Sequence, residues 1–213
     1  AVLITAPLDY ILKYRIIRAA QRKIAQFPGL KIIGITGSYG KTTMKEILAV
    51  ILAERFAVLA TPESVNTPVG VARLILKKLS KETEILIVEM GAHHKGDIRD
   101  LCALAQPDIS ILTGINEAHS ERFGSIANTL SAKFEIVRYA KPNAVVILNT
   151  EDKRVRNEYK NRCAGRTVIL YGEKADAMAR YNITDIRFEP DGLRQSFSLM
   201  NEHGALYQLS TPL

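Results

Sequence analysis

The chain has 213 residues, of which 47% are hydrophobic and 24% are charged, proportions that suit one globular domain with a sizeable core. The two cysteines, Cys102 and Cys163, are far apart in the sequence, which argues against a zinc site or a disulfide framework. No apolar run reaches the roughly eighteen residues of a membrane span. Tryptophan is absent. The net charge of +7 favours an anionic partner, which could be nucleic acid, anionic lipid or a phosphorylated small molecule. The few aromatic residues disfavour a stacking platform for single-stranded nucleic acid.

The first predicted element is a basic helix over residues 10–26. It contains five basic residues and no acidic one: Lys13, Arg15, Arg18, Arg22 and Lys23. Apolar residues recur at roughly helical spacing, which favours a helix packed by one face with a solvated basic face. The alternative is a helix beside an anionic membrane surface, in which case residues 1–4 would be the end of a removed hydrophobic segment.

Short apolar strands alternate with helices after this segment. Strands are expected over residues 31–36, 56–60, 85–89, 108–113, 144–148 and 167–170. Helices are expected over residues 42–54, 69–79, 96–105, 126–139 and 153–160. This alternation predicts an α/β fold with a mostly parallel sheet flanked by helices on both faces. Three further strands near residues 181–188, 193–199 and 205–209, separated by turn residues, predict a small antiparallel β meander at the C-terminal end.

Residues 37–43 form a glycine loop between a predicted strand and a predicted helix, which is the setting of a phosphate-binding loop. The glycines allow backbone N–H groups to converge on phosphate oxygens, and the helix N-terminus adds its dipole. We expect Lys41 to reach the β- and γ-phosphates and the Thr42 hydroxyl to bind Mg²⁺. The candidate nucleotide-binding residues of the loop are Gly37, Ser38, Tyr39, Gly40, Lys41, Thr42 and Thr43. Ile35 stands where the strict motif has its first glycine.

Acidic and histidine residues follow the third predicted strand. Glu89 ends that strand beside the loop and is placed to hold a magnesium ion with Thr42. His93 and His94 are adjacent, so their side chains diverge, and we interpret them as substrate-edge or solvent residues rather than metal ligands. His203 falls in a predicted turn and is expected at the surface.

The glycine loop and its flanks, residues 34–43, resemble the ATP loop of the Mur ligase superfamily. Further segments agree in order along the chain: residues 66–70, 88–92, 107–113, 117–119, 123–125 and 132–136, and the pair Asn149 and Asp152. The residues after Glu89 and several later segments resemble the branch that adds D-alanyl-D-alanine. The resemblance covers roughly residues 31–152 with high specificity.

The resemblance implies an ATP-dependent amide ligase of peptidoglycan precursor synthesis that works through an acyl phosphate, with ATP and two Mg²⁺ ions. It implies catalytic roles for Lys41, Glu89, His119 and Lys133. It implies metal binding by Thr42, Glu89, His119 and Lys133, with Lys133 carbamylated so that it offers anionic oxygens to the second ion. It also implies nucleotide contacts at Asn149 and substrate contacts at Asn66 and Thr67. Without the resemblance, a lysine in a helix would be interpreted as a solvated surface charge.

Residues 1–30 are expected to be a basic N-terminal leader and residues 31–213 the family's central ATPase domain. The family's N-terminal substrate domain and C-terminal domain are missing and the first residue is alanine, so we expect a fragment that is inactive alone. The implied partners are a UDP-linked muropeptide, UDP-MurNAc-tripeptide, and D-Ala-D-Ala, with no nucleic acid. The implied location is the cytoplasm, with weak membrane-surface contact through the basic helix as an added hypothesis.

Two residues depart from the family pattern. Gly114 replaces a usual asparagine, and Tyr39 stands where asparagine is common. Two other functions remain open at this point, a Mur-like ligase with a different carboxylate substrate and a nucleotide-binding module that does not ligate. A role in nucleic-acid binding would depend on net charge alone.

Overall fold

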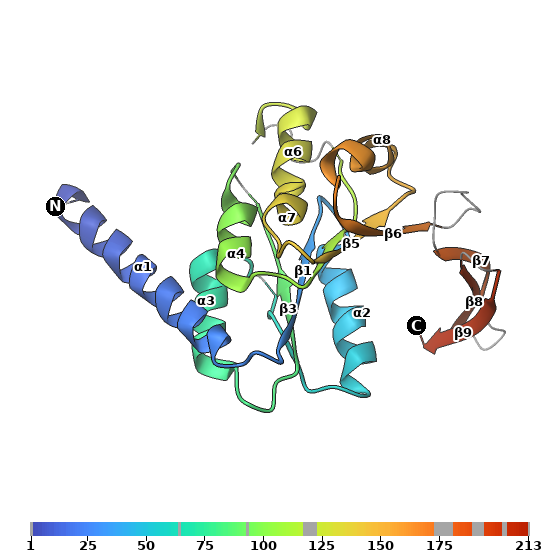
Figure 1. The fold of residues 1–213 in the computed structure, drawn as a ribbon, viewed down its shortest axis with the longest axis horizontal. Coiled ribbons are helices and arrows are strands. Elements are labelled where there is room, and N and C mark those ends of the chain that lie inside the picture. Colours follow the sequence, from blue (N-terminus) through green and yellow to red (C-terminus); the bar gives the residue numbers. More distant parts are fainter. Residues whose placement is uncertain are drawn as a thin grey trace.

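The computed structural model describes residues 2–63, 65–92, 94–116, 123–172, 181–188, 194–201 and 204–212. Within these residues, nine strands form one sheet in the order β2-β3-β1-β4-β5-β6-β7-β8-β9 (Figure 1). The first six are parallel: β1 (Lys31–Thr36), β2 (Val58–Ala60), β3 (Ile85–Glu89), β4 (Ile109–Leu112), β5 (Val145–Asn149) and β6 (Thr167–Gly172). This arrangement confirms the predicted α/β fold.

Helices cover both faces of the parallel sheet. The larger core lies between the sheet and α3 (Pro68–Lys78), α4 (Asp97–Ala105), α6 (Ile126–Lys133), α7 (Glu135–Arg138) and α8 (Lys153–Arg162). On the other face α2 (Lys41–Ala53) packs on a smaller cluster (Figure 1). Neighbouring residues of β1 alternate between these cores: Ile32 belongs to the first, and Ile33 and Ile35 belong to the second. The nearly all-apolar strands follow from burial on both faces.

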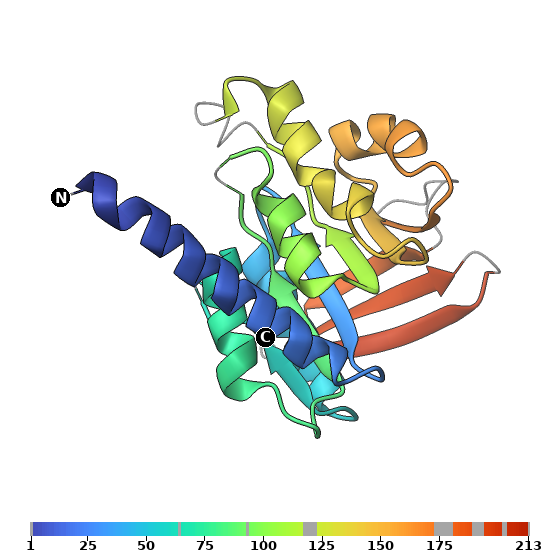
Figure 2. The same cartoon turned by 60° about the vertical axis from the view of Figure 1, so that its left-hand side comes forward.

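Helix α1 (Val2–Ala25) lies outside α3 and α4. Its C-terminal half is docked, because Ala20 is buried, Gln21 Nε2 donates to the carbonyl of Ala103 at 2.9 Å, and Lys23 Nζ donates to the carbonyl of Leu76 at 2.9 Å. Its N-terminal half projects beyond the body of the molecule (Figure 2). In the described part of the chain, no helix has both the length and the apolar character to cross a membrane.

The predicted meander is confirmed by β7 (Tyr181–Phe188), β8 (Arg194–Asn201) and β9 (Leu206–Pro212), which pair antiparallel in sequence order. It is joined to the main sheet by a short parallel pairing of β6 with β7. It therefore extends the sheet away from the glycine loop on β1 (Figure 1).

The single helix predicted over residues 126–139 is wrong, because two helices, α6 and α7, meet at Phe134. Phe134 has φ −71° and ψ −3°, a tighter turn than an α-helix, and its side chain is buried in the main core. The helical spacing of apolar residues continues across Phe134, so the sequence pattern does not reveal the break. The break leaves Lys133 and Glu135, on either side of Phe134, both buried.

Candidate active site

The glycine loop lies at the carboxyl end of β1, between β3 and β4. The order of strands turns at this point, since β2 and β3 lie on one side of β1 and β4 to β6 lie on the other. Crevices at such switch points are where open α/β sheets bind ligands. The parallel register pairs Ile35 with Glu89, which brings the acidic end of β3 beside the loop.

The loop presents a helix N-terminus that is open to an anion. Gly40 is the N-cap of α2 with φ 72°, a left-handed conformation that favours glycine, and no side chain caps the helix. The first backbone N–H groups of α2 are therefore available for phosphate oxygens. Of the described side chains, Ser38 has a buried hydroxyl with no hydrogen-bond partner, an arrangement that a phosphate would satisfy.

Thr42 and Glu89 form an oxygen-rich pair beside this loop. The Thr42 hydroxyl donates to Glu89 Oε2 at 3.0 Å, and the carboxylate is only 5% exposed. The backbone N–H of Glu89 donates to Thr61 Oγ1 at 3.0 Å, which fixes the end of the strand. A hydroxyl and a carboxylate are the hard oxygen ligands that Mg²⁺ takes, so this pair fits the expected ion. Burial lowers the pKa of the neighbouring Lys41, and the charge of Glu89 partly opposes that shift.

Lys45 is a residue of the site that the sequence analysis missed. Its side chain is 0% exposed, and its Nζ lies 3.4 Å from Glu89 Oε2 and 3.1 Å from Glu46 Oε1. A buried ammonium needs such compensation, so Lys45 partly neutralises Glu89 and helps to hold its orientation. The signal was present in the sequence, because Lys45 follows Lys41 by four residues and must share its helix face.

Lys133, at the end of α6, is 2% exposed, so its interpretation as a solvated surface lysine is wrong. Its pKa is lowered to about 8, mainly by burial and also by the charge of Lys41, while the charge of Asp97 opposes both effects. The loop lysine and Lys133 are therefore near enough to repel each other. An amine with this pKa has a minor but appreciable neutral fraction near physiological pH, unlike an ordinary lysine.

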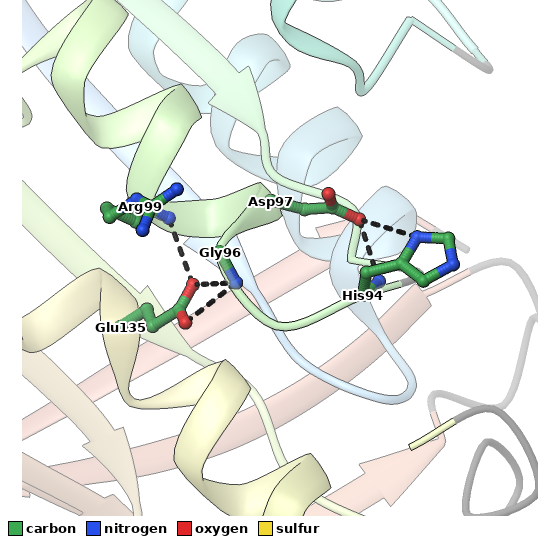
Figure 3. Close-up of polar contacts among 5 residues, drawn as sticks. All are labelled: His94, Gly96, Asp97, Arg99 and Glu135. Atoms are coloured by element: carbon green, nitrogen blue, oxygen red, sulfur yellow. Dashed lines mark hydrogen bonds and ion pairs between the residues drawn. The ribbon is translucent and has the colours of Figure 1, made fainter.

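Glu135 holds the segment that begins α4, as Figure 3 shows. Its buried carboxylate accepts hydrogen bonds from the backbone N–H groups of Gly96 at 2.9 Å and Arg99 at 3.1 Å. It thereby caps the N-terminus of α4 from α7. Asp97, in that first turn, in turn accepts from the backbone N–H of His94 at 2.8 Å. The His94 side chain is 84% exposed, in agreement with a solvent-facing residue.

Three other predicted site residues, Asn66, Thr67 and Asn149, contact or hydrogen-bond the protein itself. The Asn66 side chain lies against Gly91, just past Glu89, and the Thr67 hydroxyl caps α3 by accepting from the Gly70 N–H at 3.3 Å. Asn149 Nδ2 donates to the carbonyl of Thr113 at 3.1 Å, which ties the ends of β5 and β4 together. The structure thus brings Asn66 and the start of α3 to the Glu89 side of the glycine loop and Asn149 to its other side.

The expected metal ligand His119 lies outside the described residues, as do His93 and His203. In the part of the chain that is described, no group of three His, Cys, Asp or Glu side chains gathers around a metal position. Of the four predicted metal ligands, Thr42 and Glu89 are the two whose oxygen atoms lie together in the described residues. Cys102 and Cys163 are both buried and free.

Comparisons with known proteins identify the family of the chain. Residues 35–213 match the family model described as the Mur ligase middle domain. The chain is 27% identical over 223 residues to the UDP-N-acetylmuramoyl-tripeptide–D-alanyl-D-alanine ligase of Escherichia coli, a match covering 100% of this chain and 45% of that protein. It is 40% identical over 127 residues to the Mycobacterium leprae ligase of the same name, covering 60% of this chain and 24% of that protein.

A solved structure shows the same fold. The MurF ligase from Thermotoga maritima in complex with ADP has a TM-score of 0.81 and 29% identity, covering 93% of this chain and 44% of that one. The chain thus spans less than half the length of these relatives.

Proposed function

The chain belongs to the Mur ligase middle-domain family, and from this we propose that it is the ATP-binding core of a ligase that joins D-Ala-D-Ala to a UDP-MurNAc-tripeptide. One observation supports it most: at the end of β1 an uncapped helix N-terminus, the Thr42–Glu89 pair and two lysines converge. The tripeptide and D-Ala-D-Ala are proposed by similarity to these ligases, and ATP is proposed from the phosphate-binding loop. Because these substrates include ATP and a UDP-linked precursor, we propose a cytoplasmic location.

The proposed reaction has two steps, and the chain's residues act on charge in both. A carboxylate oxygen of the tripeptide attacks the γ-phosphorus of ATP, the bond to the β-phosphate oxygen breaks, and ADP leaves. The amine of D-Ala-D-Ala then attacks the acyl carbon, loses a proton, and expels phosphate to form the amide. Lys41 and the backbone N–H groups of α2 neutralise charge on the transferring phosphoryl group, which is the main task in such transfers.

Mg²⁺ would supply further charge neutralisation at the β- and γ-phosphates, held by Thr42 and Glu89. We propose a second ion near the acyl acceptor, with a carbamylated Lys133 and His119 as its ligands. The buried, partly neutral amine of Lys133 supports this assignment, because only a neutral amine adds to CO₂. Lys45 and Glu135 act through other residues, the first on Glu89 and the second on the N-terminus of α4.

Phosphate release by the full-length protein tests the proposed function. We expect phosphate release from Mg-ATP only when both UDP-MurNAc-tripeptide and D-Ala-D-Ala are present. The first step needs the tripeptide carboxylate, and the second step needs the amine of D-Ala-D-Ala to expel phosphate. Release with another carboxylate in place of the tripeptide would favour a Mur-like ligase of different specificity. Nucleotide binding without release under any of these conditions would favour a binding module and contradict ligation.

We also propose that the projecting half of α1 contacts an anionic membrane surface. Tyr10, Ile11 and Leu12 are about half exposed or more there. Lys13 and Arg15 follow them, and Lys13 forms an ion pair with Asp9 at 2.6 Å. Apolar side chains followed by basic ones suit the interface of an anionic bilayer, where each unpaired basic residue adds about 1 kcal/mol.

Co-sedimentation with vesicles measures this contact. We expect vesicles that contain anionic lipid to retain the chain more than neutral vesicles, and less as salt rises. Replacing Lys13 and Arg15 with glutamine should reduce retention, whereas the same change at the exposed Lys77 and Lys78 of α3 should not. Equal retention on both vesicle types would leave α1 as a packed helix with a solvated basic face.

A further inference from the structure

The two residues that depart from the family pattern touch each other. A Cβ atom built on Gly114 would lie 2.2 Å from Tyr39 Oη and 2.3 Å from Tyr39 Cζ. Such distances are far inside van der Waals contact, so the tyrosine ring lies directly on the backbone of Gly114. Any side chain at position 114 would displace the ring, and the two departures are therefore one structural change.

The ring is held at both of its ends. At the backbone, the N–H of Ser38 donates to the carbonyl of Gly114 at 2.8 Å, and the Thr113 hydroxyl donates to the carbonyl of Tyr39. At the far end, the phenol faces the carboxylate of Asp152, which together with the larger effect of burial raises the tyrosine pKa. Asp152 is itself fixed, because it caps α8 by accepting from the N–H of Arg154 at 2.8 Å.

The ring thus extends from the glycine loop across the ends of β4 and β5. This is the side of β1 opposite to β3, which carries Glu89. Glu89 and Tyr39 therefore lie on opposite sides of the loop, and a triphosphate with its γ-phosphate toward Glu89 would have its nucleoside end toward Tyr39. The ring is nevertheless 44% exposed, so an aromatic surface is presented along that path.

We propose that Tyr39 contacts the nucleoside of ATP and is a specificity-determining residue of this site. This inference rests on the proposed function and assigns the nucleoside side of the same site. The exposed ring stacks on the base or packs on the ribose, and Gly114 provides the space in which the ring lies. The loop backbone continues to bind the phosphates whatever the residue at position 39.

Calorimetry with two ligands tests the assignment. Stacking of a base on an aromatic side chain predicts that Tyr39→Ala weakens Mg-ATP binding by about 5- to 100-fold. Binding of Mg-tripolyphosphate, which has no nucleoside, should not change, and Tyr39→Phe should retain most of the ATP affinity. Unchanged ATP affinity in Tyr39→Ala, or an equal loss for both ligands, would overturn the proposal. Failure of the unaltered chain to bind either ligand would instead contradict the proposed function.

Two further variants test the contact between the Tyr39 ring and Gly114. Gly114→Ala should displace Tyr39 and reduce ATP affinity about as much as Tyr39→Ala does. The double variant Tyr39→Ala/Gly114→Ala should show no further loss, because both changes remove the same contact. Thermal unfolding confirms that each variant is folded. Full ATP affinity in a folded Gly114→Ala variant, or additive losses in the double variant, would show that the ring has no such role.

Discussion

Replacement of Lys133 with alanine should reduce ligation by the full-length protein about 100-fold or more, the scale of losing one group that stabilises transition-state charge. Lys133 is 2% exposed and is repelled by Lys41, so it lies at the site rather than on the surface. An ammonium only donates hydrogen bonds and repels Mg²⁺, whereas its carbamate would be an anion with two oxygens for the second ion. The variant loses both the carbamate and its charge.

Chemical rescue distinguishes this role from a structural one. Added short carboxylic acids should partly restore the activity of Lys133→Ala, because they return a carboxylate to the cavity. The exposed Lys160→Ala on α8 is the matched control and should remain fully active. Full activity of Lys133→Ala without any added acid would show that Lys133 has no role in ligation.

The pH dependence of carbamylation follows from the lysine pKa. Its pKa lies at about 8 instead of the ordinary 10.5, because burial and the charge of Lys41 disfavour the charged form. The neutral amine that reacts with CO₂ therefore becomes the main form as pH rises through 8, where an ordinary lysine would stay protonated. Labelling with ¹³C-bicarbonate should thus increase from pH 7 to pH 9.

The glycine loop and Glu89 could be predicted from the sequence because both follow short apolar strands. Residues 37–43 and Glu89 come directly after or at the end of strands, and a parallel sheet brings such ends to one edge. The same logic predicted the meander, where polar turns separate alternating strands. In both regions the strands expected from the sequence pattern are the strands that pair in the sheet.

The sequence places Lys45 on the helix face of Lys41, but it does not show that the charges of Lys45 and Lys133 are buried. Lys45 and Lys133 read as ordinary helical lysines, and only packing against Glu89 and the neighbourhood of Lys41 shows that both are enclosed. The contact of Tyr39 with Gly114 joins residues 75 positions apart, so no local pattern contains it. Likewise, the break at Phe134 reflects a buried ring rather than a glycine or proline.

Replacement of Lys41 with alanine should abolish measurable binding of Mg-ATP to the chain. Lys41 is the first residue of α2 and precedes Thr42, which bonds Glu89, so we expect its ammonium to reach the β- and γ-phosphates. Charge-assisted bonds to phosphate are roughly twice as strong as neutral ones, and the backbone N–H groups alone would hold the remaining charge poorly. Removing the cation also removes one of the two lysine charges beside Glu89 and leaves Lys45 as the other.

Calorimetric titration of Mg-ATP into three forms of the chain tests the existence of this nucleotide site most directly. The forms are the unaltered chain, Lys41→Ala, and a Lys77→Ala control that removes an exposed lysine of the same charge on α3. We predict binding to the unaltered chain and to the control, and none to Lys41→Ala. Equal affinity in all three forms would contradict the assignment of the loop at the end of β1 as the ATP site.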